Sequence, residues 1–273
     1  MEDRYTFLVS MKILLHEITE LSAFIKKSSP CCERLTEKLN ELSAFVVDEK
    51  NEKQWRLWES DQEIKKYASL LRETSSAAVA ALEKHQSVCT TKSNADMSGY
   101  FSSLSSAVKM DAVRCEISGT SEVFFIGSGA FPLSALTIAK ETGARLTCLD
   151  IDEEAVEMGR EIAGLSGLRD NVRFTSAPVS ELPAIKRATH VVIASLVKEK
   201  TAIIEQLSSL LPHQAKVILR YGNGLKSIFN YPYHDSPESV WKTEHVYQDK
   251  RFYDTLILTK KAQVLTGKEV EYS

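Results

Sequence analysis

The chain has 273 residues, of which 43% are hydrophobic, and a formal net charge of −3 at pH 7 from 34 basic and 37 acidic side chains. This length allows two domains, and the composition is that of a folded globular protein rather than a disordered one. The balanced charge excludes a basic nucleic-acid surface, no apolar run approaches the roughly 20 residues that span a bilayer, and no signal-peptide pattern opens the chain. We therefore expect a cytoplasmic protein that binds neither nucleic acid nor membrane.

The first part of the chain shows the spacing of amphipathic helices. Apolar residues recur at steps of three and four from Phe7 to Ile25, which predicts a helix that stops before Pro30. The same spacing predicts four further helices, over about 35–46, 51–71, 75–87 and 97–113. A polar break at 90–96 separates the last two. These segments form an expected N-terminal helical domain, residues 1–118.

From residue 119 the pattern changes to short apolar runs that alternate with helices, which is typical of a parallel sheet with crossover helices. Strands are expected at 123–126, 145–150, 172–175, 190–195 and 216–220, with a helix at 153–163. Two late strands, at 246–247 and 254–259, have no long helix between them, which predicts an antiparallel end of the sheet. We therefore expect an α/β fold in which residues 119–273 form a class I methyltransferase-like Rossmann domain. Residues 261–273 are expected to form a frayed end.

A glycine turn follows the first predicted strand and precedes a helix. Gly127 and Gly129 remove the steric limit on a tight turn, with Ser128 between them, so that backbone N–H groups can approach a ligand. Pro132 can open the helix, because the N–H that proline lacks would have no intrahelical partner there. The segment therefore predicts the cradle of a nucleotide-like ligand.

An acidic residue follows the next strand. Asp150 stands about twenty positions after the turn, where a carboxylate can accept hydrogen bonds from ribose hydroxyls. Enzymes that bind NAD usually keep a third glycine at the position of Pro132. We therefore favour S-adenosylmethionine over NAD as the ligand.

Other ligand contacts are expected outside the carboxyl ends of the remaining strands, where open parallel sheets bind their ligands. The residues at these ends are Ser176 and Ala177 for the adenine edge, Ala194, Ser195 and Leu196 near the sulfonium, and Arg220 after the fifth strand. Arg220 has two interpretations: it holds the α-carboxylate of the methionine part, or it closes a structural ion pair.

The five cysteines and six histidines show no recognised site pattern. The cysteines include no C-x-x-C pair and the histidines no H-E-x-x-H spacing. We expect neither a bound metal nor a disulfide framework.

Three segments resemble motifs of the nicotianamine synthase family. F-I-G-S-G-A-F-P-L-S at 125–134 is similar to the family's G-[SG]-G-P-[LF]-P-L-[TS], A-S-L-V at 194–197 to A-A-L-V/A, and R-Y-G-N-G-L-K-S-I-F-N-Y-P at 220–232 to R-[ST]-x-x-G-x-[RK]-x-x-L-Y-[PA]. Residues 71–85 look like the family helix that ends in L-E-x-H. The resemblance covers about residues 65–260.

The resemblance implies transfer of the 3-amino-3-carboxypropyl group of S-adenosylmethionine to the amine of an amino acid, with release of methylthioadenosine. The modest length is most similar to the bacterial enzymes of staphylopine-type opine metallophores, whose acceptor is histidine. Glu83 is the implied catalytic base and Tyr100 the residue that orients the amine, while His85, Arg220 and Tyr221 are expected to bind the substrate. The sequence also allows a homodimer.

Two other functions remain open at this stage. The same cradle would serve an S-adenosylmethionine-dependent methyltransferase acting on a small molecule, which releases S-adenosylhomocysteine instead. A non-catalytic helical module fused to a vestigial Rossmann domain would lack cofactor affinity. Glu83 itself has a plainer interpretation, as a solvated carboxylate on a helix surface.

Overall fold

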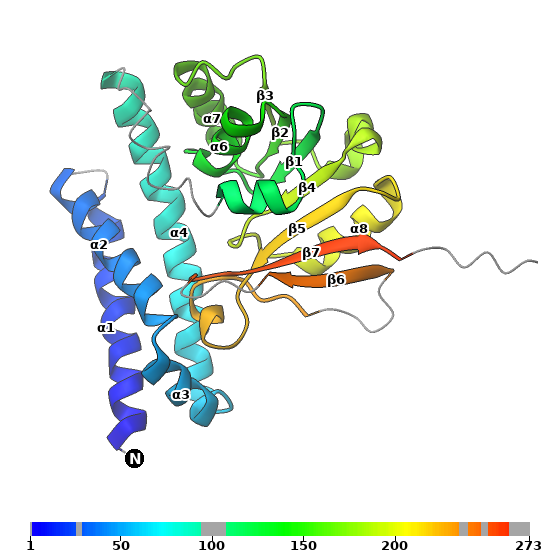
Figure 1. The fold of residues 1–273 in the computed structure, drawn as a ribbon. Helices are drawn as coiled ribbons and strands as arrows, with labels where there is room; N and C mark the ends of the chain where they lie inside the picture. Colours follow the sequence, from blue (N-terminus) through cyan, green and yellow to red (C-terminus); the bar gives the residue numbers. More distant parts are fainter. Residues whose placement is uncertain (1, 26–28, 94–107, 235–239, 247–250, 262–273) are drawn as a thin grey trace, which may run out of the picture.

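The computed structural model describes residues 2–25, 29–93, 108–234, 240–246 and 251–261. A bundle of N-terminal helices stands beside a seven-stranded sheet that carries further helices on its faces (Figure 1). One long helix, α4 (Gln62–Ser93), lies between the other N-terminal helices and the sheet. Within the described ranges, no helix is both long enough and apolar enough to cross a membrane.

The first two predicted helices are confirmed as α1 (Glu2–Phe24) and α2 (Ser29–Phe45). The next two are divided differently from the prediction. A short helix α3 (Glu49–Trp58) ends before α4, and α4 then continues through residues 75–87 without a break. The predicted polar break is also wrong at its start, because Thr90 is buried within α4.

Asp61 explains where the third helix divides. Its Oδ1 accepts hydrogen bonds from the backbone N–H groups of Glu63 (2.9 Å) and Ile64 (3.1 Å), which have no intrahelical partners at the start of α4. Arg4 of α1 donates to the same carboxylate. The apolar spacing continues across this cap, so periodicity alone did not reveal it.

The expected helix at 97–113 is described only from residue 108, and residues 108–114 are helical. The expected frayed end lies outside the described residues except for Lys261.

The helical bundle shares its core with a segment from the other half of the chain. Buried side chains of α1, α2, α3 and α4 pack with Leu225, Ile228 and Phe229, which lie in or next to the short 3-10 helix η3 (Gly224–Ile228). The two parts of the molecule are therefore joined through apolar contacts as well as through the chain.

The sheet has the strand order β3-β2-β1-β4-β5-β7-β6. Its strands are β1 (Glu122–Ile126), β2 (Arg145–Leu149), β3 (Val172–Thr175), β4 (His190–Ile193), β5 (Lys216–Tyr221), β6 (Trp241–Val246) and β7 (Asp254–Lys260). The first five are parallel, and β7 and β6 are antiparallel, as predicted. The fourth strand is shorter than expected and leaves 194–199 as a loop.

The connecting elements are α6 (Leu133–Thr142), α7 (Glu153–Leu165), η1 (Val179–Glu181), η2 (Pro183–Arg187) and α8 (Lys200–Leu210). The order of the strands in the sheet reverses at β1, since β2 and β3 lie on one side of it and β4 and β5 on the other. The loops that follow β1 and β4 therefore face each other at the switch point of the sheet, where open α/β sheets bind ligands.

Candidate active site

The loop after β1 has the conformation that its glycines predict. Gly127 (φ 77°) and Gly129 (φ 72°) both adopt the left-handed conformation that favours glycine. The N–H groups of Gly127 and Ser128 donate to the carbonyl of Leu149 at 2.8 and 3.2 Å, which ties the loop to the end of β2. Pro132 directly precedes α6, and its carbonyl accepts the N–H of Leu136.

Space beside the two glycines is already filled by protein. A Cβ on Gly127 would lie 2.4 Å from Cγ2 of Val197, in the loop after β4. A Cβ on Gly129 would lie 2.0 Å from Oε2 of Glu83. Approach of a ligand was the predicted reason for Gly129, whereas the structure places a carboxylate from α4 in that space.

Two carboxylates bind the same loop through its backbone. Asp150, directly after β2, accepts the N–H of Gly129 at 2.8 Å through Oδ2, and its Oδ1 accepts the N–H of Asp152. Glu83 accepts the N–H of Ala130 at 3.2 Å. The base and the ribose ligand predicted from sequence therefore lie at one loop, although positions 83 and 150 are 67 positions apart in the chain.

Burial, together with the charge of Asp150, raises the pKa of the Glu83 carboxyl to about 8, against the lowering effect of hydrogen bonds from the backbone of Ala130 and Phe131. The side chain is only partly accessible. This position does not fit a solvated carboxylate on a helix surface. A carboxyl group that exchanges its proton near neutral pH is suited to general base catalysis.

Two residues near Glu83 hold α4 in place: Ser87, one helical turn further on, binds the loop, and Lys84, the next residue in the chain, binds the start of α7. Ser87 donates to the carbonyl of Ala130 at 2.6 Å. Lys84 forms ion pairs with Asp152 at 2.6 Å and with Glu154 at 2.5 Å, at the start of α7.

His85 does not point at the loop with Glu83. Residues two apart in an α-helix are separated by about 200° around the axis, so His85 lies on the other side of α4. Its Nε2 is 3.3 Å from Sγ of Cys89, on the same helix. The structure therefore does not bring this expected substrate ligand to the site.

The loop after β4 contributes the expected residues Ala194, Ser195 and Leu196. The position of Gly127 faces Ala194, whose Cβ would lie 3.4 Å from a Cβ on that glycine. The carbonyl of Ser195 accepts the N–H of Tyr231 at 3.1 Å and the Nζ of Lys200 at 2.8 Å. All three expected residues are partly accessible beside the glycine loop.

Lys200 was not identified from the sequence. It is 1% exposed, its Nζ also donates to the carbonyl of Val197, and burial lowers its pKa to about 7. A lysine in the first turn of a helix resembles many surface residues, so only the fold reveals that this one supports the loop after β4.

The end of β3 lies next to Asp150, whose N–H donates to the carbonyl of Thr175 at 3.2 Å. Ser176 is exposed there, and the N–H of Ala177 donates to the hydroxyl of Thr175 at 3.1 Å. These residues stand at the carboxyl edge of the sheet, where the adenine contact was predicted.

Arg220 forms a buried ion pair with Asp111 at 3.4 Å, which is one of the two interpretations that the sequence left open. Tyr221 points to the opposite face of the sheet, as successive strand residues do, and packs edge-on against Tyr233. It is therefore separated from the face that Arg220 occupies. Tyr100 lies outside the described residues.

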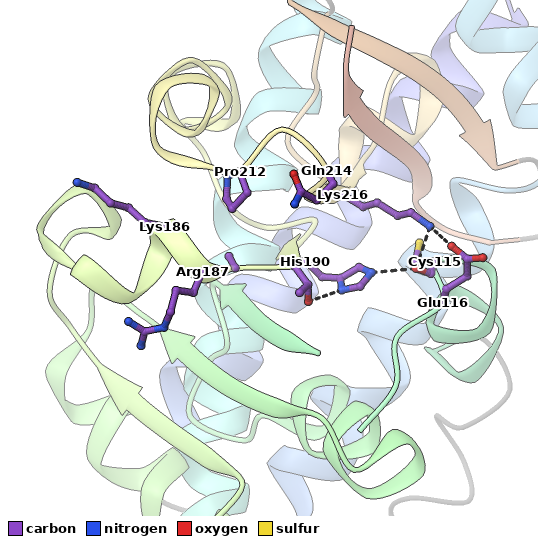
Figure 2. Close-up of a pocket in the computed structure, with 10 residues that line it drawn as sticks. Cys115, Glu116, Lys186, Arg187, His190, Pro212, Gln214 and Lys216 are labelled. Atoms are coloured by element: carbon purple, nitrogen blue, oxygen red, sulfur yellow. Dashed lines mark hydrogen bonds and ion pairs between the residues drawn. The ribbon is translucent and has the colours of Figure 1, made fainter. Parts of the chain in front are cut away.

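A hollow of about 490 Å³ lies at the amino edge of the strands, opposite the edge that carries the glycine loop (Figure 2). His190 and Lys216 begin β4 and β5 there, and both reach the carbonyl of Cys115. Lys186 and Arg187 point away from this pair in Figure 2. Since its central side chains bond to the Cys115 carbonyl and to the neighbouring Thr189 and Glu116, we regard this hollow as structural.

The glycine loop offers groups that fit a nucleoside ligand. No group of three or more potential metal ligands occurs among the described residues. The glycine loop offers backbone, Asp150 offers a carboxylate, and the buried Ser128 hydroxyl has no hydrogen-bond partner within the described structure. The backbone of this loop and the carboxylate of Asp150 are groups that a site for S-adenosylmethionine would use.

Comparisons with known proteins identify the family of this chain. Residues 3–266 match the family "Nicotianamine synthase protein". An L-histidine 2-aminobutanoyltransferase of Pseudomonas aeruginosa is 36% identical over 260 residues, covering 95% of this chain and 99% of the relative. A protein of the same name from Yersinia pestis is 32% identical, covering 90% and 92%. The solved structure of MtNAS in complex with MTA and tNA superposes with a TM-score of 0.77 at 17% identity, covering 93% of this chain and 97% of that one.

Proposed function

Because the chain belongs to the nicotianamine synthase family, we propose that it transfers the 3-amino-3-carboxypropyl group of S-adenosylmethionine to the amine of histidine and releases methylthioadenosine. The name shared by its relatives, L-histidine 2-aminobutanoyltransferase, supports histidine as the acceptor. The product is then the intermediate of an opine-type metallophore.

The observation that carries this proposal is the carboxyl of Glu83 at the glycine loop. Its Oε2 lies 3.2 Å from the N–H of Ala130, and Gly129 in the same loop binds Asp150. A base with a pKa of about 8 therefore stands next to the expected donor site.

The chemistry requires a base but no acid. An ammonium group has no free electron pair, so the acceptor must lose a proton before its nitrogen attacks the γ-carbon beside the sulfonium. S-adenosylmethionine supplies that electrophilic carbon. The bond from carbon to sulfur breaks as the bond to nitrogen forms, and methylthioadenosine leaves as a neutral thioether. Glu83 takes the proton of the amine.

Other residues of this chain bind and orient the donor and the acceptor. Asp150 holds the ribose, while the backbone from Gly127 to Gly129 and the residues 194–196 line the donor site. Lys200 supports the 194–199 loop through hydrogen bonds to the carbonyls of Ser195 and Val197. Tyr100 remains the expected orienting residue for the amine.

Product analysis tests the proposal. The purified protein is incubated with S-adenosylmethionine and a panel of L- and D-amino acids, and the products are identified by mass. Methylthioadenosine and an aminobutanoyl adduct of histidine are expected. Release of S-adenosylhomocysteine with a methylated product would instead establish a methyltransferase.

The proposal includes a cytoplasmic location, a boundary between a helical and a Rossmann-like domain near residue 118, and a homodimer. Light scattering coupled to size-exclusion chromatography measures the oligomeric state, and a monomer mass near 30.5 kDa would exclude the dimer.

A further inference from the structure

A second hollow, of about 380 Å³, lies between α3, the first half of α4 and η3. Its volume is within the range of pockets that bind small molecules. The wall carries charges of both signs, since Lys65 and Arg72 come from α4 and Glu59 directly follows α3. The indole of Trp55 also lines it. We name this hollow the α3–α4 pocket.

The α3–α4 pocket is separate from the candidate active site. Arg72 precedes Glu83 by eleven residues on α4, which corresponds to about 16 Å along the helix axis. None of the described residues that line the pocket belongs to the glycine loop or to the 194–199 loop. A ligand of this pocket would therefore not compete for the space of the donor.

Arg72 has no anionic partner of its own in the wall of the pocket. Its Nη1 donates to the carbonyl of Ser227 at 2.6 Å, and its Nη2 to the hydroxyl of Ser69 at 3.4 Å. Its Nε is buried and has no hydrogen-bond partner among the described residues. The next residue in the chain, Glu73, forms its ion pair with Lys198. The guanidinium therefore interacts directly with neutral oxygen atoms only, although a carboxylate is the acceptor that it matches best.

The other polar groups of the pocket also lack partners. Trp55 is 7% exposed, and its Nε1 is buried without a hydrogen-bond partner in the described structure. Lys65 and Glu59 are exposed, and neither forms an ion pair with another described residue. The wall therefore offers cationic donors for a carboxylate and, beside them, a carboxylate for an ammonium group.

We propose that the α3–α4 pocket binds a free α-amino acid as its zwitterion, with the carboxylate toward Arg72 and Lys65 and the ammonium toward Glu59. A simple anion such as phosphate would meet the charge of Glu59, and a simple cation would meet the two basic residues. A ligand that carries both charges complements all three. This site goes beyond the proposed function, because it takes part in no step of the transfer.

Fluorescence of Trp55 tests the proposal at the pocket itself. The chain has three tryptophans, so a protein with Trp58→Phe and Trp241→Phe emits from Trp55 alone. L-histidine is titrated without donor at constant ionic strength, and a saturable change in emission is expected. Histamine lacks the carboxylate and imidazolepropionate lacks the ammonium group. Each should bind at least about 10-fold more weakly, because each loses a charged hydrogen bond.

Substitutions in the same reporter protein identify the residues that bind. Arg72→Met should weaken histidine binding by about 10- to 100-fold. Lys65→Met and Glu59→Gln change exposed side chains, so that the fold is kept, and each should weaken binding by about 2- to 5-fold. Lys66→Met is the matched control, because Lys66 is an exposed lysine of α4 that does not line the pocket. It should leave the affinity unchanged.

Three results would each overturn the proposal. The first is no saturable change up to about 10 mM histidine, a concentration that nearly fills a site with a Kd of about 1 mM. The second is equal binding of histidine and histamine, and the third is an equal effect of Lys65→Met and Lys66→Met. The titration needs neither donor nor turnover. It therefore decides this inference even if the parent releases no methylthioadenosine with any acceptor, a result that overturns only the proposed function.

Discussion

The carboxyl of Glu83 releases its proton only near pH 8, because burial and the charge of Asp150 penalise the ionised form. Replacing it by glutamine keeps the size and the acceptor for Ala130 N–H but removes the base. We expect Glu83→Gln to bind S-adenosylmethionine like the parent and to lose about 10²–10⁴-fold in kcat at pH 7. Steady-state kinetics over pH 6–10 measure this.

The loss should shrink as pH rises, because the acceptor amine then deprotonates without help. The control is Glu157→Gln, on the exposed side of α7, whose side chain is 69% exposed and pairs with Arg160. A deficit in Glu83→Gln that pH does not relieve would assign Glu83 a structural role.

The same raised pKa predicts how stability depends on pH. Between about pH 4.5, the ordinary value, and about 8, the native state keeps the proton of Glu83 while the unfolded chain releases it. The free energy of unfolding of the parent therefore falls with rising pH in this window, relative to a chain without the group. The melting temperature of Glu83→Gln should exceed that of the parent by an increment that grows from pH 5 to pH 8. An increment that stays constant across that range would contradict the raised pKa.

Gly129 lies against Glu83, and a substitution there should report on that contact. We expect Gly129→Ala to destabilise the protein, because the new Cβ would lie 2.0 Å from the carboxylate. Gly167→Ala is a matched control: Gly167 has nearly the same φ, 70°, but nothing lies within 4 Å of its Cβ position. Chemical denaturation should give a larger loss at Gly129.

Removing the carboxylate should cancel that excess. In a Glu83→Ala background, the loss in free energy of unfolding caused by Gly129→Ala should approach the loss caused by Gly167→Ala. What remains is the backbone strain common to both positions. Equal costs of Gly129→Ala in both backgrounds would show that Glu83 does not restrict this position.

The N-terminal cap of α4 contributes to the free energy of unfolding. Asp61→Ala removes the acceptor for two N–H groups and the ion pair with Arg4. We expect a loss of about 0.5–2 kcal/mol in the free energy of unfolding, measured with urea.

Asp61→Asn separates the two contributions. Asparagine caps helices as well as aspartate but cannot form the ion pair, which is partly exposed and therefore weak. The asparagine variant should retain most of the stability. If it loses as much as the alanine variant, the ion pair rather than the cap holds this end of α4.

The same cap shows why sequence patterns predicted most elements but not all their limits. The parallel strands and the helices at 2–24 and 153–165 were predictable from the spacing of their apolar residues and from the residues that end each element. The interruption between Trp58 and Gln62 contains no glycine or proline, so its signal was a single aspartate. Thr90 lies in α4 because tertiary packing buries it, which its polarity does not indicate.

Across the whole molecule, the predictable part of the site is the part that is contiguous in sequence. Gly127, Gly129 and Asp150 were predicted because one supersecondary unit carries them. Lys200 could not be predicted, because its burial and its hydrogen bonds to the carbonyls of Ser195 and Val197 arise only in the folded loop after β4. Glu83 was assigned through family resemblance, and the structure gives the physical reason for its position.

The helical bundle and the sheet should unfold together, because Ile228 of η3 is fully buried in the core of the bundle. Ile228→Ala should lower the free energy of unfolding by about 2–5 kcal/mol through the cavity it creates. The tryptophans provide separate reporters: Trp55 and Trp58 lie in α3, and Trp241 begins β6.

Fluorescence of a Trp241→Phe protein then follows the helical bundle, and fluorescence of a protein with phenylalanine at 55 and 58 follows the sheet. In urea, both reporters should show one coincident transition, and Ile228→Ala should move both midpoints by the same amount. These two results are required if the shared core couples the helical bundle to the sheet. If Ile228→Ala shifted the midpoint of the α3 reporter while the β6 reporter kept its midpoint, the helical bundle would unfold independently of the sheet. The contact between Glu83 and the glycine loop could then break while the sheet stays folded.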